Sequence, residues 1–253
     1  MLISRTPYRF SLYGGGLDYP GWYKKNSARV LCAGLDYYCY QTVRELPPFF
    51  DHNYRASYSK IETTNTLDEI EHPSVREVFR KFGGGKRLEV GHVGDLPARS
   101  GIGSSSAFTV GLISSLTALN GEYLGRTSLA NAAISIEQNE MSENVGFQDQ
   151  CAAAFGGLVL IDADKEGVKP RRFICRKEYI EYIESSLLMG FDGAHRYSGI
   201  ASKKITTAIS QEKNAEYLNE LHVLSQEGIK AFGMEESIEK NAEITKKCRD
   251  IKM

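Results

Sequence analysis

The residues with the clearest chemical potential are the glycines and serines of one run. It reads Leu96-Pro97-Ala98-Arg99-Ser100-Gly101-Ile102-Gly103-Ser104-Ser105-Ser106-Ala107. Glycines let a backbone turn tightly and approach a ligand, and the free amides at the start of a following helix attract an anion. The serines can cap that helix, or can offer hydroxyls to a phosphate or to Mg²⁺. The run therefore predicts a phosphate-binding loop, with a plain serine-capped helix as the alternative. No lysine follows Gly103, so the loop is not of the Walker type.

One acidic side chain is expected to point inward from a helix over residues 127–141. Glu137 lies four residues after Ala133 and eight after Leu129, on the inward stripe of that helix. A carboxylate there costs several kcal/mol unless it is paired or bound to a metal. Glu137 is therefore a candidate magnesium ligand, and Glu140, on nearly the same face, is its rival.

Three further charged residues lie beside small residues that allow a ligand to approach. Asp149 stands between two glutamines, shortly before three alanines, and Asp18 follows three glycines. Arg9 lies on an expected strand next to that glycine run. Each also has an ordinary explanation: a helix cap for Asp149, a turn for Asp18 and a surface ion pair for Arg9.

These residues need strands and helices to hold them. The phosphate loop is expected between a strand over 88–93 and a buried helix over 108–119 that is apolar nearly all round. Two extended segments closed by Pro47-Pro48 predict a hairpin-like unit. By the same criteria, strands are expected at 2–3, 8–13, 29–35, 37–44, 54–61, 155–161 and 187–191, and helices at 72–82 and from 203 onward.

Composition excludes several classes of protein. The 253 residues are 42% hydrophobic and 25% charged, which is typical of a globular protein of one large or two small domains. Basic and acidic residues balance at 31 and 32, with no basic stripe among aromatics, so no nucleic-acid partner is expected. No apolar stretch approaches the ~20 residues of a membrane span, so no membrane partner is expected. Five cysteines without a CxxC motif and a start that lacks an apolar signal predict a cytoplasmic protein.

The loop resembles a motif of a known family. Its sequence is similar to PxxxGLGSSAA, the phosphate loop of the GHMP kinases, which include galactokinase, homoserine kinase, mevalonate kinase and phosphomevalonate kinase. Ile102 in place of leucine and Ser106 in place of alanine are mild departures.

The N-terminal run resembles the first motif of the same family. Residues 7–19 align without a gap with the PGRVNLIGEHTDY of galactokinases, and they keep Arg9, Gly14, Asp18 and Tyr19. Gly15-Gly16 stands where galactokinases have Glu-His. This variant, with the Gln-Asp-Gln segment around Asp149, is most similar to the D-glycero-D-manno-heptose 7-phosphate kinase branch.

The resemblance implies roles for individual residues. Asp149 would act as base on the substrate hydroxyl or orient it, and Arg9 would lie near the transferred phosphoryl group. Mg²⁺ would be held by Ser105 and Glu137. Arg196 would bind a substrate phosphate, with an exposed loop as the alternative. The ATP phosphates would contact Pro97, Gly101, Ile102, Gly103, Ser104, Ser105 and Ser106, and the substrate would contact Gly15, Gly16, Asp18 and Tyr19.

The resemblance also implies an α+β, two-domain fold. Residues 1–165 would form a domain like ribosomal protein S5 domain 2, and residues 166–253 a truncated ferredoxin-like domain. The family's third motif, a glycine-rich loop of the GAGGGG kind, has no counterpart after Gly199. We therefore expect an incomplete second domain with an exposed sheet edge or apolar face.

The implied function is ATP-dependent phosphorylation of a sugar hydroxyl. The heptose branch points to conversion of D-glycero-D-manno-heptose 7-phosphate to the 1,7-bisphosphate, for nucleotide-activated heptose and surface polysaccharide. The alternatives are a GHMP kinase of fucose, uronic acid or mevalonate type, and a non-catalytic remnant that binds ATP or sugar. The oligomeric state stays open, with a homodimer as the assembly to test.

Overall fold

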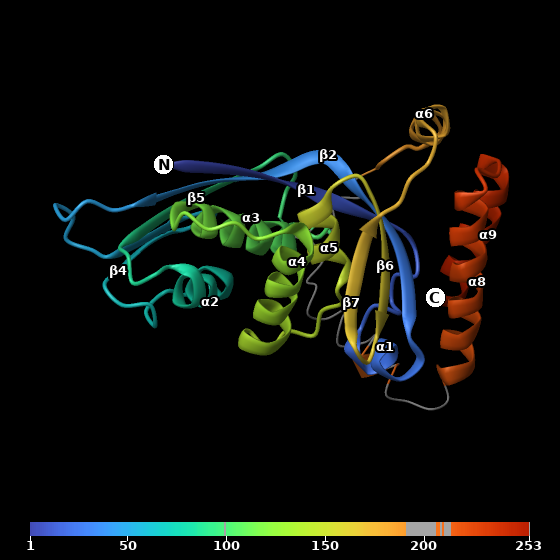
Figure 1. Ribbon diagram of the computed structural model, residues 1–253, viewed down its shortest axis with the longest axis horizontal. Helices are drawn as coiled ribbons and strands as arrows, with labels where there is room; N and C mark the ends of the chain where they lie inside the picture. The colour runs from blue at the N-terminus through green and yellow to red at the C-terminus, as the bar shows by residue number, and fades with distance from the viewer. Residues whose placement is uncertain (99, 191–205, 208, 210–213, 253) are drawn as a thin grey trace.

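One mixed sheet forms the frame of the molecule. The computed structural model describes residues 1–98, 100–190, 206–207, 209 and 214–252. Within these ranges seven strands join in a single sheet, in which β1 pairs with β2 and the other strands follow the order β4-β3-β5-β2-β6-β7 (Figure 1). Their bounds are β1 Leu2–Tyr13, β2 Ala28–Glu45, β3 Tyr54–Ser57, β4 Ile61–Thr64, β5 Leu88–Gly94, β6 Leu158–Asp164 and β7 Gly167–Arg172.

The long strand β2 connects the two ends of the sheet. One edge pairs with β1, while the other pairs first with β6, through Ala28–Ala33, and then with β5, through Cys39–Glu45. The hairpin predicted at 29–44 is therefore wrong. No turn forms because the backbone of Gly34 continues the pairing by donating to Gly157 O at 2.9 Å. A side chain there would be crowded, since a Cβ on Gly34 would lie 3.1 Å from Gly157 N.

Strand β1 runs through its proline without ending. Pro7 pairs with Tyr38, and the register shifts between Pro7 and Arg9. Since β1 pairs only with β2 within the described ranges, the missing amide of Pro7 can face away from the ladder. The two strands predicted at 2–3 and 8–13 are thus one strand, which carries Arg9 into the interior.

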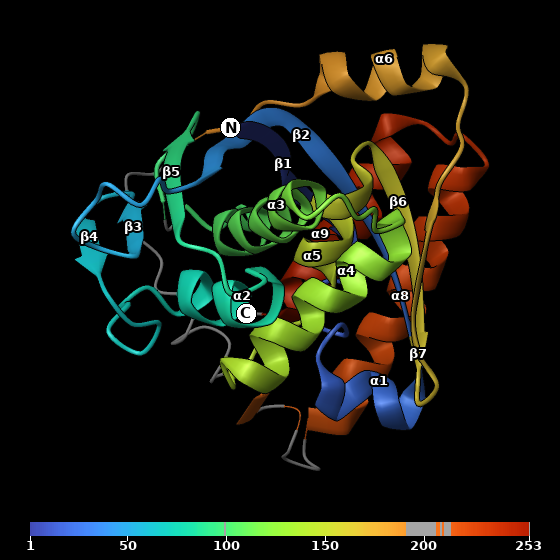
Figure 2. The same cartoon turned by 60° about the vertical axis from the view of Figure 1, so that its left-hand side comes forward.

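A helical layer covers one face of the sheet. Helix α3 (Ser104–Leu119) packs on β1 and β2, and it is surrounded by α2, α4 and α5 (Figure 2). Eleven of its residues are buried, as its nearly uniform apolar sequence predicts. The other bounds are α1 Pro20–Asn26, α2 Pro73–Phe82, α4 Arg126–Ser135, the π-helical turn η1 Ile136–Glu140 and α5 Gln148–Phe155.

The C-terminal part, as far as it is described, adds helices to this sheet. These are α6 (Lys177–Ser186), α8 (Ala215–Gly233) and α9 (Ile238–Lys252), and α8 and α9 pack together beside the start of β2 (Figure 1). The Tyr13 hydroxyl at the end of β1 donates to Asn241 Oδ1 at 2.9 Å. The aromatic ring fits because position 228 is glycine: a Cβ there would lie 2.3 Å from Tyr13 Cε1.

The mixed α+β fold predicted from the sequence is confirmed. The boundary proposed between residues 165 and 166 lies in the turn between β6 and β7, so β7 extends the sheet of the first segment. The strand predicted at 187–191 is absent from Leu187–Gly190, where the backbone forms no strand and Leu188 is 97% exposed, and the last residue lies outside the described ranges. Among the described helices, none combines the length and the apolarity needed to cross a bilayer.

Candidate functional site

The glycine–serine run forms a sharp loop at the start of α3. Gly101 and Gly103 have φ angles of +78° and +75°, in the left-handed region that favours glycine. Gly103 is the N-cap of α3, and no side chain caps the helix, so the serine-capped alternative does not describe it. The first helical bond runs from Ala107 N to Gly103 O. The amides of residues 104–106 therefore have no partner within the helix and are available to an anion.

Hydrogen bonds from strand β1 hold this loop in place. Arg9 N donates to Ile102 O at 3.0 Å, and Arg9 Nη1 donates to Gly101 O at 3.1 Å. The strand and the loop, about 90 residues apart in the chain, are thus fixed against each other. This contact places the Arg9 guanidinium at the edge of the anion site.

Arg9 and Asp149 form a two-pronged ion pair. Arg9 Nε donates to Oδ1 at 2.6 Å and Nη2 donates to Oδ2 at 3.0 Å. The Arg9 side chain is only 18% exposed, so it is not a surface pair. Asp149 is not a helix cap either, because α5 begins after Phe147 without a side-chain cap. A Cβ on Gly103 would lie 3.0 Å from Asp149 Oδ2, so the pair lies against the loop.

Glu137 is buried and Glu140 is exposed in the π-helical turn. Glu137 is 1% exposed, and its Oε2 accepts from Ser106 Oγ at 2.8 Å. Glu140 lies at the surface beside Lys81 Nζ, at 3.1 Å. A π-turn widens the helix by one residue and is common at functional sites. Glu137 is therefore the carboxylate that faces the loop helix, in preference to its rival.

Burial makes Glu137 unusual among the acidic residues. It raises the pKa of the Glu137 carboxyl to about 7, and the hydrogen bonds from Ser106 and Gln150 offset part of this effect. Its Oε1 has no hydrogen-bond partner among the described residues. A buried carboxylate oxygen without a partner is costly in apolar surroundings, and a cation would satisfy it. The side chain thus fits a divalent ion.

The other ligands of such an ion would not come from a protein cluster. No group of three or more His, Cys, Asp or Glu side chains converges within the described parts of the chain. Mg²⁺ sites in general keep several waters and substrate phosphates as ligands. Ser105, expected to share the ion, is exposed on the first turn of α3, whereas Ser106 is buried and engaged with Glu137. A metal contact of Ser105 stays a prediction.

The N-terminal glycine run wraps around a buried aspartate. Asp18 is 2% exposed, and its Oδ1 accepts from Gly16 N at 2.8 Å, as its turn-forming alternative predicts. Burial and the nearby charge of Asp149 raise the pKa of Asp18. Burial and the charges of Asp18 and Asp149 also raise the pKa of the Tyr19 hydroxyl. Asp18, Tyr19 and Asp149 therefore share one electrostatic environment.

Close backbone approach explains two glycines here. A Cβ on Gly15 would lie 2.6 Å from Ser11 Oγ, and one on Gly146 would lie 1.7 Å from Asp18 Oδ2. Gly146 was not singled out in the sequence, although it immediately precedes the segment that carries Asp149.

The structure brings most of the expected residues into one region. Arg9, Asp149 and Gly101–Gly103 touch one another, and Ser106 touches Glu137. Arg196 lies outside the described residues. Gln150 was missed as a contributor: its Nε2 donates to Glu137 Oε2 at 2.5 Å. A polar residue in the otherwise small and apolar run after Asp149 was the signal for it.

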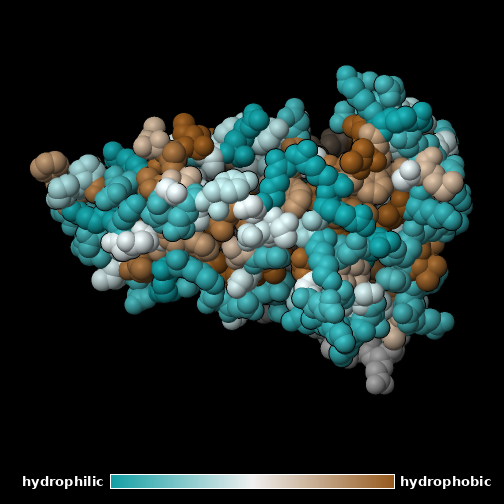
Figure 3. Space-filling view, viewed as in Figure 1, coloured by the Kyte–Doolittle hydropathy of each residue, from teal (hydrophilic) through white to brown (hydrophobic). Residues whose placement is uncertain are grey.

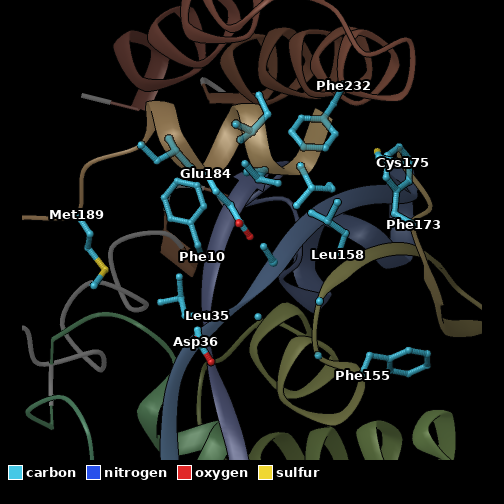
Figure 4. Close-up of a pocket in the computed structure, with 18 of the residues that line it drawn as sticks. Phe10, Leu35, Asp36, Phe155, Leu158, Phe173, Cys175, Glu184, Met189 and Phe232 are labelled. Carbon is cyan, nitrogen blue, oxygen red and sulfur yellow. The ribbon is translucent and has the colours of Figure 1, made fainter. Parts of the chain in front are cut away.

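A separate cavity of about 990 Å³ lies under α6 (Figure 4). Its lining is mainly apolar and includes Phe10, Leu35, Ile183 and Phe232. Hydrophobic side chains are also visible beneath α6 on the molecular surface (Figure 3). The lining contains none of Arg9, Asp149 and Glu137, so this cavity is distinct from the loop site.

Comparisons with known proteins agree with the motifs. Residues 70–157 match the family model for the GHMP kinases N terminal domain. The chain is 26% identical, over 243 residues, to D-glycero-alpha-D-manno-heptose 7-phosphate kinase of Campylobacter jejuni subsp. jejuni serotype O:2. That match covers 90% of this chain and 69% of the relative.

Two solved structures share the fold. One is a D-glycero-D-manno-heptose 1-phosphate kinase from Bacteriodes thetaiotaomicron, 22% identical, with a TM-score of 0.69 over 89% of this chain and 75% of that chain. The other is Streptococcus pneumoniae phosphomevalonate kinase in complex with phosphomevalonate and AMPPNP, 14% identical. Its TM-score is also 0.69, over 98% of this chain and 79% of that one.

Proposed function

We propose that this chain, of which residues 70–157 match the model of the GHMP kinases N terminal domain, is a sugar kinase that transfers the γ-phosphoryl group of ATP to a hydroxyl of a heptose phosphate. The observation that carries the proposal is the Arg9–Asp149 ion pair lying against the Gly101–Gly103 turn. It puts a cation and a carboxylate next to a ready-made anion site. Phosphoryl transfer needs this kind of positioning and charge neutralisation more than covalent chemistry.

The ATP phosphates would bind at the start of α3. The free amides of residues 104–106 and the positive end of the helix dipole favour an anion there. The left-handed glycines bring the backbone close enough for those amides to reach phosphate oxygens. A solved structure of the same fold is described as a complex with AMPPNP, which supports a nucleotide as a ligand of this fold.

Asp149 would orient the acceptor hydroxyl. Arg9 occupies one position on each carboxylate oxygen, which leaves the other lone pairs to accept from an incoming hydroxyl. The Arg9 guanidinium would at the same time face the transferred phosphoryl group, for which its planar fork is suited. The ion pair would thus hold the acceptor hydroxyl, which is the nucleophile, next to the transferred phosphoryl group.

Mg²⁺ would be held by Glu137, with Ser105 as the expected second protein contact. When bound, the ion neutralises charge on the ATP phosphates. Glu137 supplies a buried carboxylate oxygen that lacks another partner, and Ser106 and Gln150 hold the opposite oxygen.

The sugar would bind around the N-terminal glycine run. Asp18 and Tyr19 lie near Asp149, and the Gly15-Gly16 turn directly precedes them in the chain. The name of the Campylobacter relative supports heptose 7-phosphate as the substrate. The product would then be the 1,7-bisphosphate. We also expect the protein to act in the cytoplasm, where ATP is abundant. Its assembly would be a homodimer, which gel filtration can test.

A substrate panel tests the function. ATP-dependent phosphorylation is measured with heptose 7-phosphate, heptose 1-phosphate, fucose, a uronic acid, galactose and mevalonate, for the wild type and for Asp149→Asn. The proposal expects heptose 7-phosphate to be preferred and the variant to be slower by about 10²-fold or more. A preference for mevalonate, or equal near-zero rates for both proteins, would reject it.

A further inference from the structure

Gln150 is the second donor to the buried carboxylate of Glu137. It is 0% exposed and lies in the first turn of α5, next to Asp149. Its Nε2 donates to Glu137 Oε2 at 2.5 Å, and Ser106 Oγ donates to the same oxygen at 2.8 Å. Both protein donors thus converge on one oxygen, while Oε1 has no hydrogen-bond partner among the described residues.

Two donors on one oxygen restrict how the carboxylate can turn. With a single donor, the carboxylate plane can rotate about the Glu137 side chain and exchange its two oxygens. Ser106 comes from α3 and Gln150 from α5, so together they fix the plane from two elements. Oxygen Oε1 is then the one that stays available to a ligand.

We infer that Gln150 is a positioning residue, which orients Glu137 so that Oε1 is presented to the divalent cation that accompanies ATP. The inference rests on the proposed function, because it takes Glu137 as the carboxylate that holds the ion. Partners of ligating carboxylates generally tune metal affinity in this way. Gln150 acts through Glu137 and needs no contact of its own with substrate.

Stability alone does not account for this glutamine. Its own Oε1 is buried and has no hydrogen-bond partner among the described residues. An unsatisfied buried polar atom is unfavourable, and an apolar side chain of similar shape would avoid it. What glutamine adds at this position is the hydrogen bond to Glu137.

Gln148 provides a matched control on the same helix. It is also buried, at 8% exposure, and its Oε1 also lacks a partner within the described ranges. Its Nε2 lies 3.5 Å from where a Cβ on Gly15 would be, whereas the donors to Glu137 Oε2 are Ser106 and Gln150. Gln148→Met therefore removes a similar buried amide without touching Glu137.

The test measures cation binding without turnover. Mn²⁺ is titrated into the complex of the full chain with AMPPNP, and binding is followed by electron paramagnetic resonance and calorimetry. We expect Gln150→Met to weaken Mn²⁺ binding by about 10- to 100-fold, and Gln148→Met to leave it within about twofold of the wild type. In the Glu137→Gln background, Gln150→Met should cause no further loss, because its effect passes through Glu137.

Kinetics give a second readout. The Mg²⁺ concentration for half-maximal rate should rise for Gln150→Met, while kcat at saturating Mg²⁺ falls much less. Gln150→Asn, which is one methylene too short to reach Glu137, should show the same rise in the Mg²⁺ requirement. It replaces Gln150→Met as the test variant if the methionine variant does not fold.

Each outcome has a distinct meaning. Unchanged Mn²⁺ affinity in folded Gln150→Met or Gln150→Asn overturns the inference, and so does an equal loss in Gln148→Met. A wild type that binds Mn²⁺ with AMPPNP but phosphorylates no sugar rejects the proposed function and leaves the role of Gln150 standing. A wild type that binds no Mn²⁺ overturns both.

Discussion

Arg9 and Asp149, 140 positions apart in the chain, meet through two hydrogen bonds of 2.6 and 3.0 Å. Arg9 comes from an edge strand and Asp149 from the first turn of α5. The same guanidinium also donates to Gly101 O in the loop. Three elements of the fold therefore meet at one side chain, and a change of its shape should disturb all of them.

Arg9→Lys should lower kcat/KM by about 10²-fold, because lysine keeps the charge but cannot form the two-pronged contact. Initial rates with ATP and heptose 7-phosphate measure this effect. Arg5→Lys is the matched control on the same strand, since Arg5 is exposed and stacks on Tyr38 at 4.3 Å. Equal rates for Arg9→Lys and the wild type would contradict a role for the two-pronged contact between Arg9 and Asp149.

Gly103→Ala should damage both stability and activity. An alanine at φ +75° is strained by ~1–2 kcal/mol, and its Cβ would lie 3.0 Å from Asp149 Oδ2 and 3.1 Å from Arg9 Cγ. We expect kcat to fall by about 10²-fold, because Asp149 and Arg9 must move. Chemical denaturation and initial rates measure the two effects separately.

Gly121→Ala separates backbone strain from the clash. Gly121, just after α3, has almost the same φ, +76°, but a Cβ there meets nothing within 4 Å. This variant should lose similar stability and keep the wild-type kcat. A similar loss of kcat in both variants would show that the clash with the ion pair is not the cause.

Gly146→Ala should act on substrate binding through Asp18. Its Cβ would lie 1.7 Å from Asp18 Oδ2, so the carboxylate must leave its place. If Asp18 binds a sugar hydroxyl, the lost hydrogen bond, worth about 1.5–3 kcal/mol, should lower kcat/KM for the sugar by about 10- to 100-fold. The KM for ATP should change little.

Gly125→Ala is the control for Gly146→Ala. Position 125 precedes α4, and a Cβ there meets nothing within 4 Å. Steady-state kinetics with the sugar varied at saturating ATP make the comparison. An unchanged KM for the sugar in folded Gly146→Ala would remove Asp18 from the substrate site.

Local patterns predict the parts of the site that depend on local structure. The loop with its left-handed glycines and the buried helix after it follow from residues 96–119, because both depend on turn chemistry and apolar periodicity. The choice of Glu137 over Glu140 is different. The two positions lie on nearly the same face of an ordinary α-helix, whereas the structure has a π-helical turn, which no periodicity reveals, with Glu137 buried and Glu140 at the surface beside Lys81.

Long-range contacts explain where the sequence-based predictions fail. The residue pattern of 29–44 predicts two strands, yet β2 continues through Gly34, which lies close to Gly157, more than a hundred residues later. Gln150 was missed for the same reason: its partner Glu137 belongs to another element. Such roles depend on tertiary neighbours, which one sequence does not display.

The pH dependence of stability should expose the buried carboxyl of Glu137 in metal-free protein. Burial raises its pKa from 4.5 to about 7 in the folded state. The folded state therefore holds the proton more tightly than the unfolded state. The stability from Glu137 is fully present below pH 4.5 and is lost as the pH rises through about 7. The shift corresponds to about 3 kcal/mol between these limits.

Urea denaturation between pH 5 and pH 8, in the presence of a chelator, measures this dependence. Glu137→Gln should lack the part of the pH dependence of stability that comes from Glu137. The other groups titrate alike in both proteins, so their contributions cancel when the stability profile of the variant is subtracted from that of the wild type. Glu140→Gln is the control, since Glu140 lies at the surface beside Lys81, and it should keep the wild-type profile. Mg²⁺ with AMPPNP should reduce the loss at pH 8 in the wild type, because a bound cation favours the ionised carboxylate. A Glu137→Gln profile parallel to that of the wild type would mean that Glu137 is ionised throughout this range.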